Sequence, residues 1–440
     1  MKDLNVYFDE KFIKNTKDKN HNILFNCSPN FSLDKYKSIN FLIDDYANEI
    51  REKVWFWYKK YTTEKLNESL TSKFRWINEK LKFAIISSRF NSGNIIDSDI
   101  TNIIKIISII VWSKHKKIKK IKFYGFNKKF IRPIKNILKF YKINIKLIFE
   151  EIPKNNLLKK IDLNILKGHA SIFKFLFKFI FKKKRGELPR GTKKSNYIFI
   201  DYLFNLDDRL NSSYWGEITN LLPKGSTVEI LHIFVNSKET PSISKANKLI
   251  DKLNNKKNKH KILHRLVNSE MNLLDLVHSI FEFFIIIFYS LKSKNDSLIY
   301  DLIKKDLSKS FYTSELLNSL IYKNFFFRYL NYDLSKTNII FVGENQSWEK
   351  SLSYVAIKRN CKKSVFSIQT SIRFWDMRFY KPFINITDKN RFPSIIACNS
   401  KFSYLQLSKI IPNKYLKIVE NNRSNINYKK RSKFKKKRIW

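Results

Sequence analysis

The sequence predicts an α/β protein with two domains, each built on a parallel β-sheet covered by helices. Three observations lead to this fold class. Short apolar runs alternate with segments of helical periodicity, the alternation stops near residue 153 and restarts near residue 195, and 440 residues with 43% hydrophobic content can fill two cores. We expect an N-terminal α/β domain over 1–152, a basic aromatic segment and linker over 153–194, a C-terminal α/β domain over 195–428 and a basic tail over 429–440.

In the N-terminal half, short apolar runs predict strands, and longer segments with apolar residues three or four apart predict helices. The predicted strands are 4–8, 23–27, 39–43, 121–124 and 143–149. The predicted helices are 45–61, 100–112 with Asp99 as its cap, and 131–141. Strands that alternate with helices of this length are typical of βαβ units around a parallel sheet.

The C-terminal half repeats this alternation and adds a helical block. The predicted strands are 197–202, 228–234, 261–264, 338–342, 364–368, 394–398 and 416–419. The predicted helices are 214–222, which ends at Pro223, 242–256, which begins at Ser242, the helical block 271–332, and 401–410.

The connecting segment contains an aromatic and basic stretch, 171–185, in which Phe is interspersed with Lys before a basic run. This composition is typical of a segment that lies on an anionic membrane surface. It also fits a helix between two domains whose lysines extend their charged ends to water. Both interpretations remain open. Gly186, Pro189 and Gly191 then mark a linker and a domain boundary near residue 190.

The chain carries 86 Lys and Arg against 38 Asp and Glu, a net charge of +48. The first interpretation is codon bias of an AT-rich genome, because Lys, Asn, Ile, Phe and Tyr are abundant and the lysines are spread over the whole length. Attraction to an anionic membrane ranks second. Nucleic-acid binding through phosphate neutralisation ranks third, so we do not expect nucleic acid as a partner.

The sequence predicts a cytoplasmic protein, soluble or peripheral on the inner face of the cytoplasmic membrane. The N-terminus lacks the apolar core of a secretory signal, and no uncharged run approaches the roughly 18 residues that span a bilayer. The longest apolar segment, 280–289, contains Glu282 and predicts a core helix or an interfacial one. Three cysteines without metal-ligand spacing indicate a reducing compartment.

Local signatures of several site classes are missing from the sequence. It contains no GxGxxG, P-loop, CxxC, HExxH or GxSxG pattern, so we expect no metal and no cofactor. Asp97-Ser98-Asp99 has the Asp-x-Asp form of metal-dependent sugar transferases, but it directly precedes a helix, and we favour helix capping. Asp207-Asp208-Arg209 follows a strand, and we interpret it as a solvated turn.

Two polar clusters follow predicted strands and form the main candidate site. The segment 343–350 follows the strand 338–342, and 369–379 follows the strand 364–368. Open α/β folds bind ligands outside the carboxyl ends of their strands. We expect one of Glu344 and Glu349 to project into the site while the other caps or pairs, and Gln346 to hydrogen-bond a sugar or base edge. The alternative is that the tryptophans of both clusters are packing residues and the charges are solvated.

Other side chains accompany this site. Arg373 and Arg378 can clamp a phosphate through paired hydrogen bonds. His232, at the end of a predicted strand, is a candidate general base because imidazole titrates near neutral pH, and Tyr214-Trp215-Gly216 is expected beside the main site. The alternative for His232 is a core histidine with satisfied hydrogen bonds.

These residues resemble a glycosyltransferase family of bacterial surface carbohydrate biosynthesis proteins, encoded in O-antigen loci. The family pattern E-x-Q-x-W-E-(K/R)-x-L matches 344–352, and R-F-W-D-L-R-(Y/F) is matched by Arg373, Phe374, Trp375, Asp376 and Arg378. Weaker likeness lies at 199–204, 214–216, 231–234, 393–399 and 419–420. The resemblance covers roughly 195–425. Gln369 stands where the family pattern has a histidine, so a degenerate transferase kept as a scaffold is an alternative.

The resemblance implies two Rossmann-like domains that face a crevice, the GT-B-like arrangement. It implies metal-independent transfer of a sugar from a nucleotide-sugar donor to a glycan or lipid-linked acceptor in surface polysaccharide biosynthesis. The catalytic candidates are Glu344 and His232. The donor-binding candidates are Gln346, Glu349, Gln369, Thr370, Ser371, Arg373, Trp375, Asp376 and Arg378. The competing class is a non-enzymatic basic protein that binds nucleic acid or a membrane.

Overall fold

The computed structural model divides the chain into two compact units. Unit 1 comprises Met1–Phe90, Asn94–His169 and Ile285–Thr313, and unit 2 comprises Asn91–Gly93, Ala170–Phe284 and Ser314–Trp440. Within these units the structure describes residues 3–13, 21–26, 36–58, 73–87, 99–150, 170, 172–173, 195–204, 212, 214–215, 218–255, 262–292, 310–332, 334–344, 346–359, 361, 364–367, 394–408 and 411–419. The expected linker, except for three of its residues, and the expected basic tail therefore lie outside the described residues.

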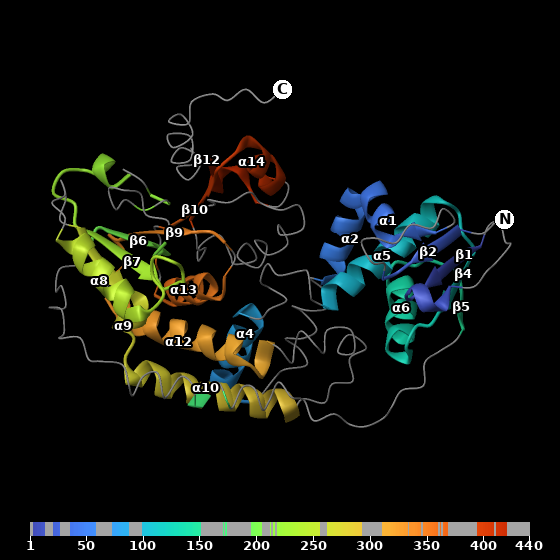
Figure 1. The fold of residues 1–440 in the computed structure, drawn as a ribbon, viewed down its shortest axis with the longest axis horizontal. Coiled ribbons are helices and arrows are strands. Elements are labelled where there is room, and N and C mark those ends of the chain that lie inside the picture. The colour runs from blue at the N-terminus through green and yellow to red at the C-terminus, as the bar shows by residue number, and fades with distance from the viewer. Residues whose placement is uncertain are drawn as a thin grey trace. The chain divides into compact units, whose positions relative to one another are not determined.

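Unit 1 is built on a five-stranded sheet in which every neighbouring pair is parallel (Figure 1). The order is β3-β2-β1-β4-β5. This is the 3-2-1-4-5 order of doubly wound α/β folds. The strands are β1 (Leu4–Tyr7), β2 (His21–Leu24), β3 (Lys37–Ser38), β4 (Lys120–Tyr124) and β5 (Lys146–Glu150).

Besides the short η1 (Glu10–Phe12), the helices of unit 1 are α1 (Ile39–Asp45), α2 (Ala47–Tyr58), α4 (Arg75–Ser87), α5 (Asp99–His115) and α6 (Lys128–Phe140). Of these, α1, α2 and α6 contact α5, a helix rich in isoleucine whose apolar side chains are buried. The predicted strand 39–43 is wrong, because it is the start of α1. The Ser38 side chain accepts a hydrogen bond from the Asn40 backbone N–H, and Ile39 and Leu42 share the buried helix face. The sequence reasoning also missed α4.

Unit 2 is built on a seven-stranded parallel sheet with the order β12-β11-β10-β9-β6-β7-β8. Counted from β6, this is again the doubly wound order, and the direction of strand addition reverses between β6 and β9. The strands are β6 (Tyr197–Tyr202), β7 (Val228–Ile233), β8 (Ile262–Leu266), β9 (Asn338–Val342), β10 (Ser364–Ser367), β11 (Ile395–Cys398) and β12 (Leu416–Ile418). All seven predicted strands are confirmed, with bounds that shift by at most two residues.

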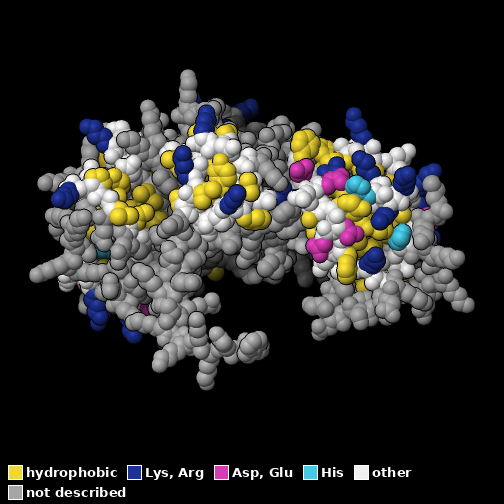
Figure 2. Space-filling model, turned by 90° about the horizontal axis from the view of Figure 1, so that it is seen from above, with side chains coloured by type: hydrophobic (Ala, Val, Ile, Leu, Met, Phe, Trp, Pro, Cys, Tyr) yellow, Lys and Arg dark blue, Asp and Glu magenta, His cyan; other side chains and the backbone are white. Residues whose placement is uncertain are grey.

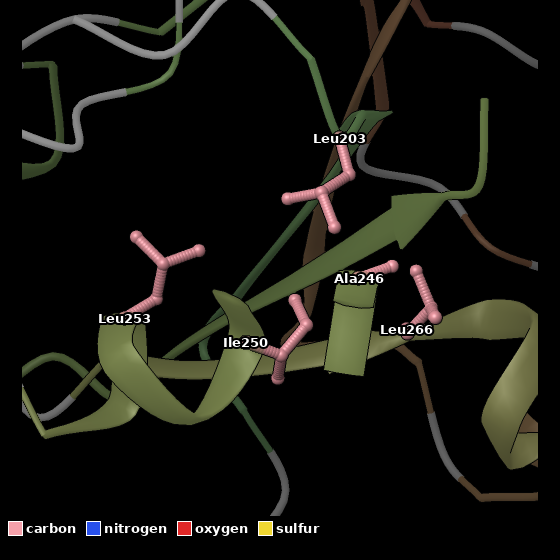
Figure 3. Packing of buried hydrophobic residues seen from close by; sticks show 5 residues of the cluster. All are labelled: Leu203, Ala246, Ile250, Leu253 and Leu266. Carbon is pink, nitrogen blue, oxygen red and sulfur yellow. The ribbon is translucent and has the colours of Figure 1, made fainter. Parts of the chain in front are cut away.

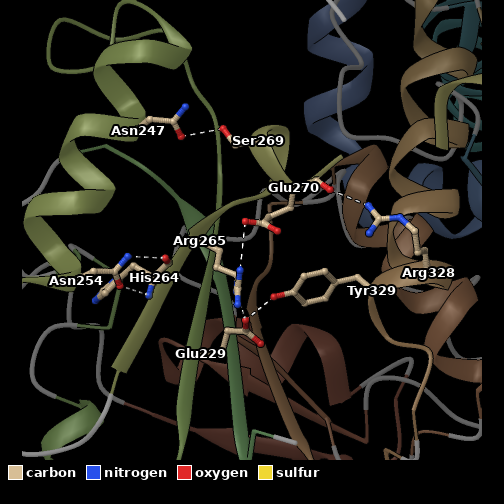
Figure 4. Close-up of polar contacts among 9 residues, drawn as sticks. All are labelled: Glu229, Asn247, Asn254, His264, Arg265, Ser269, Glu270, Arg328 and Tyr329. Carbon is tan, nitrogen blue, oxygen red and sulfur yellow. Dashed lines mark hydrogen bonds and ion pairs between the residues drawn. The ribbon is translucent and has the colours of Figure 1, made fainter. Parts of the chain in front are cut away.

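Helices cover both faces of the second sheet. On one face α8 contributes Ala246, Ile250 and Leu253 to a core with Leu203 and Leu266 (Figure 3). On the other face lies α12, whose Tyr329 bonds Glu229 of β7 (Figure 4). The helices of unit 2 are α8 (Ile243–Asn254), α9 (Val267–Glu270), α10 (Leu273–Lys292, which continues into unit 1), α12 (Ser314–Tyr329), α13 (Ser347–Lys358) and α14 (Lys401–Ser408), with the short η4 (Ile218–Leu221) and η8 (Asn413–Tyr415).

The predicted helix 214–222 is wrong. Tyr214 and Trp215 form a turn, and among the described residues of this segment the helical ones are Ile218–Leu221, which form a 3-10 helix. Both aromatic side chains are buried. Ser212 also accepts a hydrogen bond from the Tyr214 backbone N–H through its hydroxyl and favours the turn. The predicted start of α8 at Ser242 is confirmed, since the Ser242 hydroxyl accepts from the Lys245 N–H.

Candidate functional site

Each sheet has one place where its strand order reverses, and doubly wound folds bind ligands at the carboxyl ends of the strands that flank this place. In unit 1 these strands are β1 and β4, and in unit 2 they are β6 and β9. The two places are therefore the first positions in which to look for a ligand site. Their residues differ in kind.

In unit 1 this position is filled by aromatic rings. Tyr7 ends β1 and Tyr124 ends β4, and their rings stack with centroids 4.8 Å apart. Tyr36 meets Tyr7 edge-on at 5.6 Å, and the Phe12 ring lies against Gly125. Gly125 has a φ of +75°, and a Cβ there would lie 2.2 Å from the Phe12 ring. The described residues at this position form a packed apolar cluster rather than a polar site.

In unit 2 the corresponding position is polar. Strand β9 leads through Gly343 to Glu344, a partly exposed carboxylate, and α13 begins at Ser347. The Glu344 backbone N–H donates to Glu349 Oε1 at 2.9 Å, and Glu349 is fully buried in the first turn of α13. A carboxylate in the first turn is stabilised by the partial positive charge of a helix N-terminus. Glu349 therefore holds the loop between β9 and α13, and Glu344 is the carboxylate nearer to solvent.

Trp348 ties this loop to the neighbouring strand. Its indole N–H donates to the Tyr202 hydroxyl at 2.9 Å, and its ring contacts Tyr202 and Phe341 edge-on. Burial raises the pKa of Tyr202 well above its usual value, and the charge of Glu349 adds to the effect. Trp348 is itself buried, so the alternative interpretation of this residue as a packing residue is confirmed.

Tyr214, in the segment after β6, contacts the Glu344 carboxylate. Its hydroxyl donates to Glu344 Oε1 at 3.2 Å, which confirms the expectation that Tyr214 lies beside the main site. Its position is set by Ser212, whose hydroxyl accepts from the Tyr214 backbone N–H at 3.1 Å and donates to Asp201 Oδ2 at 2.7 Å. A carboxylate with a fixed donor on one oxygen keeps its orientation.

Asp201, His232 and His264 form a buried row across β6, β7 and β8. His232 Nδ1 lies 2.6 Å from Asp201 Oδ1, and His232 Nε2 lies 3.0 Å from His264 Nδ1. An ionised carboxylate only accepts, so Nδ1 of His232 carries the proton that it donates to Asp201. In neutral His232, Nε2 then accepts from His264 Nδ1–H. Asp201, although fully buried, receives hydrogen bonds from Ser212 and His232 and is satisfied in the way buried charges require.

Hydrogen bonds thus link the row of three residues to Glu344 through Ser212 and Tyr214. Both ring nitrogens of His232 lie within this row, so an acceptor hydroxyl could reach neither without breaking one of the two contacts. Glu344, in contrast, is partly exposed at the end of the sheet. Of the two predicted bases, Glu344 is placed where a ligand can reach it, whereas His232 is placed as a core histidine.

The remaining candidate residues divide into two groups. Gln346 is exposed at the N-cap of α13, and its Nε2 lies 3.4 Å from the Glu344 carbonyl oxygen, which accepts. The others lie outside the described residues: Gln369, Thr370, Ser371, Arg373, Trp375, Asp376 and Arg378. The same holds for Asp97-Ser98 and for Asp207-Asp208-Arg209.

A second buried polar network lies on the opposite face of the sheet, and it serves packing (Figure 4). Arg265 on β8 donates to Glu229 at 2.8 Å and to Glu270 at 3.3 Å, and the Tyr329 hydroxyl donates to Glu229. Burial raises the pKa of Glu229, against the hydrogen bonds from Tyr329 and Arg265. Burial, followed by the Glu229 charge, raises the pKa of Tyr329 well above its usual value. Each charge in the network is paired. The hydrogen bonds and ion pairs hold β7, β8, α9 and α12 together.

A metal site and a nucleic-acid interface each require a particular arrangement of side chains. The described residues contain no group of three or more His, Cys, Asp and Glu side chains that could hold a metal ion. On the face drawn in Figure 2, the Lys and Arg side chains are scattered among apolar ones. Scatter of this kind favours the compositional interpretation of the charge over a nucleic-acid interface.

No protein-family model matches the chain, and neither a curated protein nor a solved structure matches it. These comparisons therefore assign no family, and the resemblance to glycosyltransferases of surface carbohydrate biosynthesis stays a hypothesis.

Sequence reasoning did not assign Asp201, Ser212, Tyr202 or His264 to the site. A signal was present in the strands themselves. On one face of the sheet, the consecutive strands β6, β7 and β8 each carry one Asp or His residue, while Glu229 and Arg265 lie on the other face. Parallel pairing in register brings such residues together, so a shared face in three successive strands could have predicted the row.

Proposed function

We propose that this protein is a glycosyltransferase that moves a sugar from a nucleotide-sugar donor to a glycan or lipid-linked acceptor in surface polysaccharide biosynthesis. The observation that carries the proposal is the oriented, partly exposed Glu344 carboxylate at the β6/β9 position of the second sheet. Ligands of doubly wound folds bind there. Fold alone does not select a reaction, so the sugar-transfer chemistry rests on the motif resemblance at 344–352 and 373–379.

Glu344 acts as the general base in this proposal. Its carboxylate takes the proton of an acceptor hydroxyl while that oxygen bonds to the anomeric carbon of the donor sugar. The bond between the anomeric carbon and the donor phosphate oxygen breaks, and the nucleoside diphosphate leaves with the electron pair. Arg373 and Arg378 are the proposed cations that stabilise the negative charge of this leaving group. The transfer is metal-independent and belongs to the GT-B-like class.

Three residues that are joined to Glu344 directly or through a chain of hydrogen bonds act as positioning residues. The Tyr214 hydroxyl orients the carboxylate, Glu349 holds the Glu344 backbone N–H, and His232 holds Asp201, which in turn fixes Ser212 and Tyr214. Gln346 is placed next to Glu344 and is proposed to bind the donor. We propose that Gln369, Thr370, Ser371, Trp375 and Asp376 complete the donor site, whereas Glu349 is fully buried and positions Glu344 instead of contacting the donor.

Ligand-dependent stability tests the donor class. We expect a uridine or cytidine diphosphate, or a sugar ester of one of them, to stabilise the protein against heat. A ligand at one hundred times its Kd adds about 2.7 kcal/mol to the unfolding free energy of a protein that binds it only when folded. Arg373→Ala should lose this stabilisation. If no nucleotide in such a panel raises the melting temperature, the proposal is wrong.

The chemistry is tested separately with Glu344→Gln. This change keeps the size of the side chain and an oxygen that can accept from Tyr214, so nucleotide stabilisation should persist. Release of nucleoside diphosphate in the presence of a lipid-linked glycan acceptor should fall by about 10² to 10⁴. Glu150→Gln is a matched control, because Glu150 is also partly exposed at the end of a strand but belongs to unit 1. Nucleotide binding by the wild type without any release would favour the degenerate scaffold.

A further inference from the structure

Helix α10 carries a row of large apolar side chains on its outer side, although others, such as Leu276 and Phe283, are buried. In the part of α10 that belongs to unit 2, Leu273, Leu274, Val277 and Phe281 are between 48% and 63% exposed. Their spacing places them along one side of the helix. Isolated exposed apolar residues are common on soluble proteins, but a row of four along one helix face is a patch of the kind that marks an interaction site.

The two acidic side chains of α10 face the protein. Asp275 is buried and accepts from Arg328 of α12 at 2.8 Å and 2.6 Å. Glu282 forms an ion pair with Lys323 of α12, which is also buried. The inner side of α10 thus combines ion pairs with buried apolar side chains, while the row of four apolar side chains and His278 are exposed.

The position of α10 explains how this face stays exposed. α12 packs on α13 and, through Tyr329, on the sheet, and α10 lies beyond α12, on the side away from the sheet (Figure 1). The ion pairs on its inner side hold α10 against α12. Among the described residues, α10 is also the one helix that is long and apolar enough to cross a membrane by length and composition alone. Because the inner face of α10 is hydrogen-bonded and ion-paired to α12, a membrane could contact its outer face but could not surround the helix.

We propose that the outer face of α10 docks on a lipid bilayer that contains anionic headgroups. An interfacial helix of this kind lies in the plane of the bilayer, with its apolar side chains about 5–10 Å into the boundary of the acyl chains. The net charge of +48 supplies attraction to such a surface, since each basic residue near an anionic membrane contributes to binding. The same charge opposes the other obvious occupant, because a second copy of this chain would bring another +48 to the contact. The inference stands independently of the transferase proposal.

Vesicle flotation of the full chain tests this inference. The probe is phosphatidylcholine vesicles with and without a minority of phosphatidylglycerol, at low and at high salt. The test variant is Leu274→Ser with Phe281→Ser. The matched control is Leu405→Ser with Phe402→Ser, which removes the same side-chain types from α14, where they are 50% and 56% exposed.

We expect the wild type and the α14 control to float with the anionic vesicles, and the α10 variant to bind them at least about ten-fold more weakly. The free energy gained by burying two such apolar side chains in the bilayer is larger than the free energy that corresponds to a ten-fold change in the binding constant. Removing both side chains should therefore weaken binding by at least that factor. Salt should weaken the binding of all three proteins. Circular dichroism and the melting temperature establish whether the variants are folded. We expect them to fold, because the substituted side chains are exposed.

Three results would overturn the inference. The wild type could fail to bind anionic vesicles, or both double variants could lose binding to the same extent. The third is loss of self-association in the α10 variant, measured by sedimentation, with unchanged vesicle binding, which would show that a second copy covers the face.

Discussion

Replacing Tyr202 with Phe removes a single hydroxyl from the site and leaves the ring in place. That hydroxyl accepts the hydrogen bond from the Trp348 indole N–H at 2.9 Å, and Trp348 is buried. The change creates no cavity, so the cost is that of a buried donor left without its acceptor, about 1–3 kcal/mol. We expect Tyr202→Phe to lower the free energy of unfolding by this amount at pH 8.

The same change should become less harmful in alkali. Burial, with the Glu349 charge, raises the pKa of Tyr202 well above its usual value of 10.0. A group whose pKa is raised on folding contributes stability that is complete below the unfolded pKa and is lost as the pH rises through the folded pKa. The wild type should therefore lose about 1.4 kcal/mol per pH unit above pH 10 from this one residue, whereas phenylalanine loses nothing. The disadvantage of the variant should vanish within about two pH units.

Urea unfolding followed by tryptophan fluorescence, at pH 8 and at intervals above pH 10, measures both effects. Tyr197→Phe is the matched control, because Tyr197 begins the same strand and is partly exposed. Its effect should stay within about 0.5 kcal/mol. The reasoning is refuted if the two variants are equally destabilised at pH 8, or if the deficit of Tyr202→Phe stays constant above pH 10.

Three further changes test the packing of the two units, each by the shift of the urea midpoint. Gly125→Ala should lower the free energy of unfolding more than Gly225→Ala. Both glycines have a positive φ, which costs about 1–2 kcal/mol for a residue with a Cβ, but of the two only at Gly125 would the new Cβ meet a ring, that of Phe12. Equal losses of stability in the two variants would contradict this. Ile250→Ala, in the core beneath α8, should cost about 2–5 kcal/mol, and a loss under 1 kcal/mol would show that the core is not packed there. Burial raises the pKa of Glu229, so the wild type should lose stability as the pH rises from its usual value of 4.5 through the folded value. Glu229→Gln lacks this loss and should be most harmful below pH 4.5, and a deficit that grows toward neutral pH would refute the assignment.

Local periodicity predicted the regular elements well where one pattern was present. Strand β9 was predicted at 338–342 and lies there, because the four apolar, β-forming residues after Asn338 are bounded by turns and leave little alternative. The segment 39–43 shows where this reasoning stops, since an apolar run of five residues fits a strand or a buried helix turn equally well. The Ser38 cap and the burial of Ile39 and Leu42 decide for the helix, and burial depends on the rest of the unit.

The sequence by itself determined that the chain is α/β with parallel sheets, and that a polar cluster around Glu344 follows a buried strand. Only the tertiary structure decided which groups meet that carboxylate. Tyr214 lies 130 residues away in the chain, and Asp201, His232 and His264 come together because β6, β7 and β8 pair in register. Hydrophobic periodicity reports on neighbours along the chain. The order of strands in a sheet follows from how all the helices and strands pack at once, and this order brings Tyr214 and Tyr202 to Glu344 and its loop.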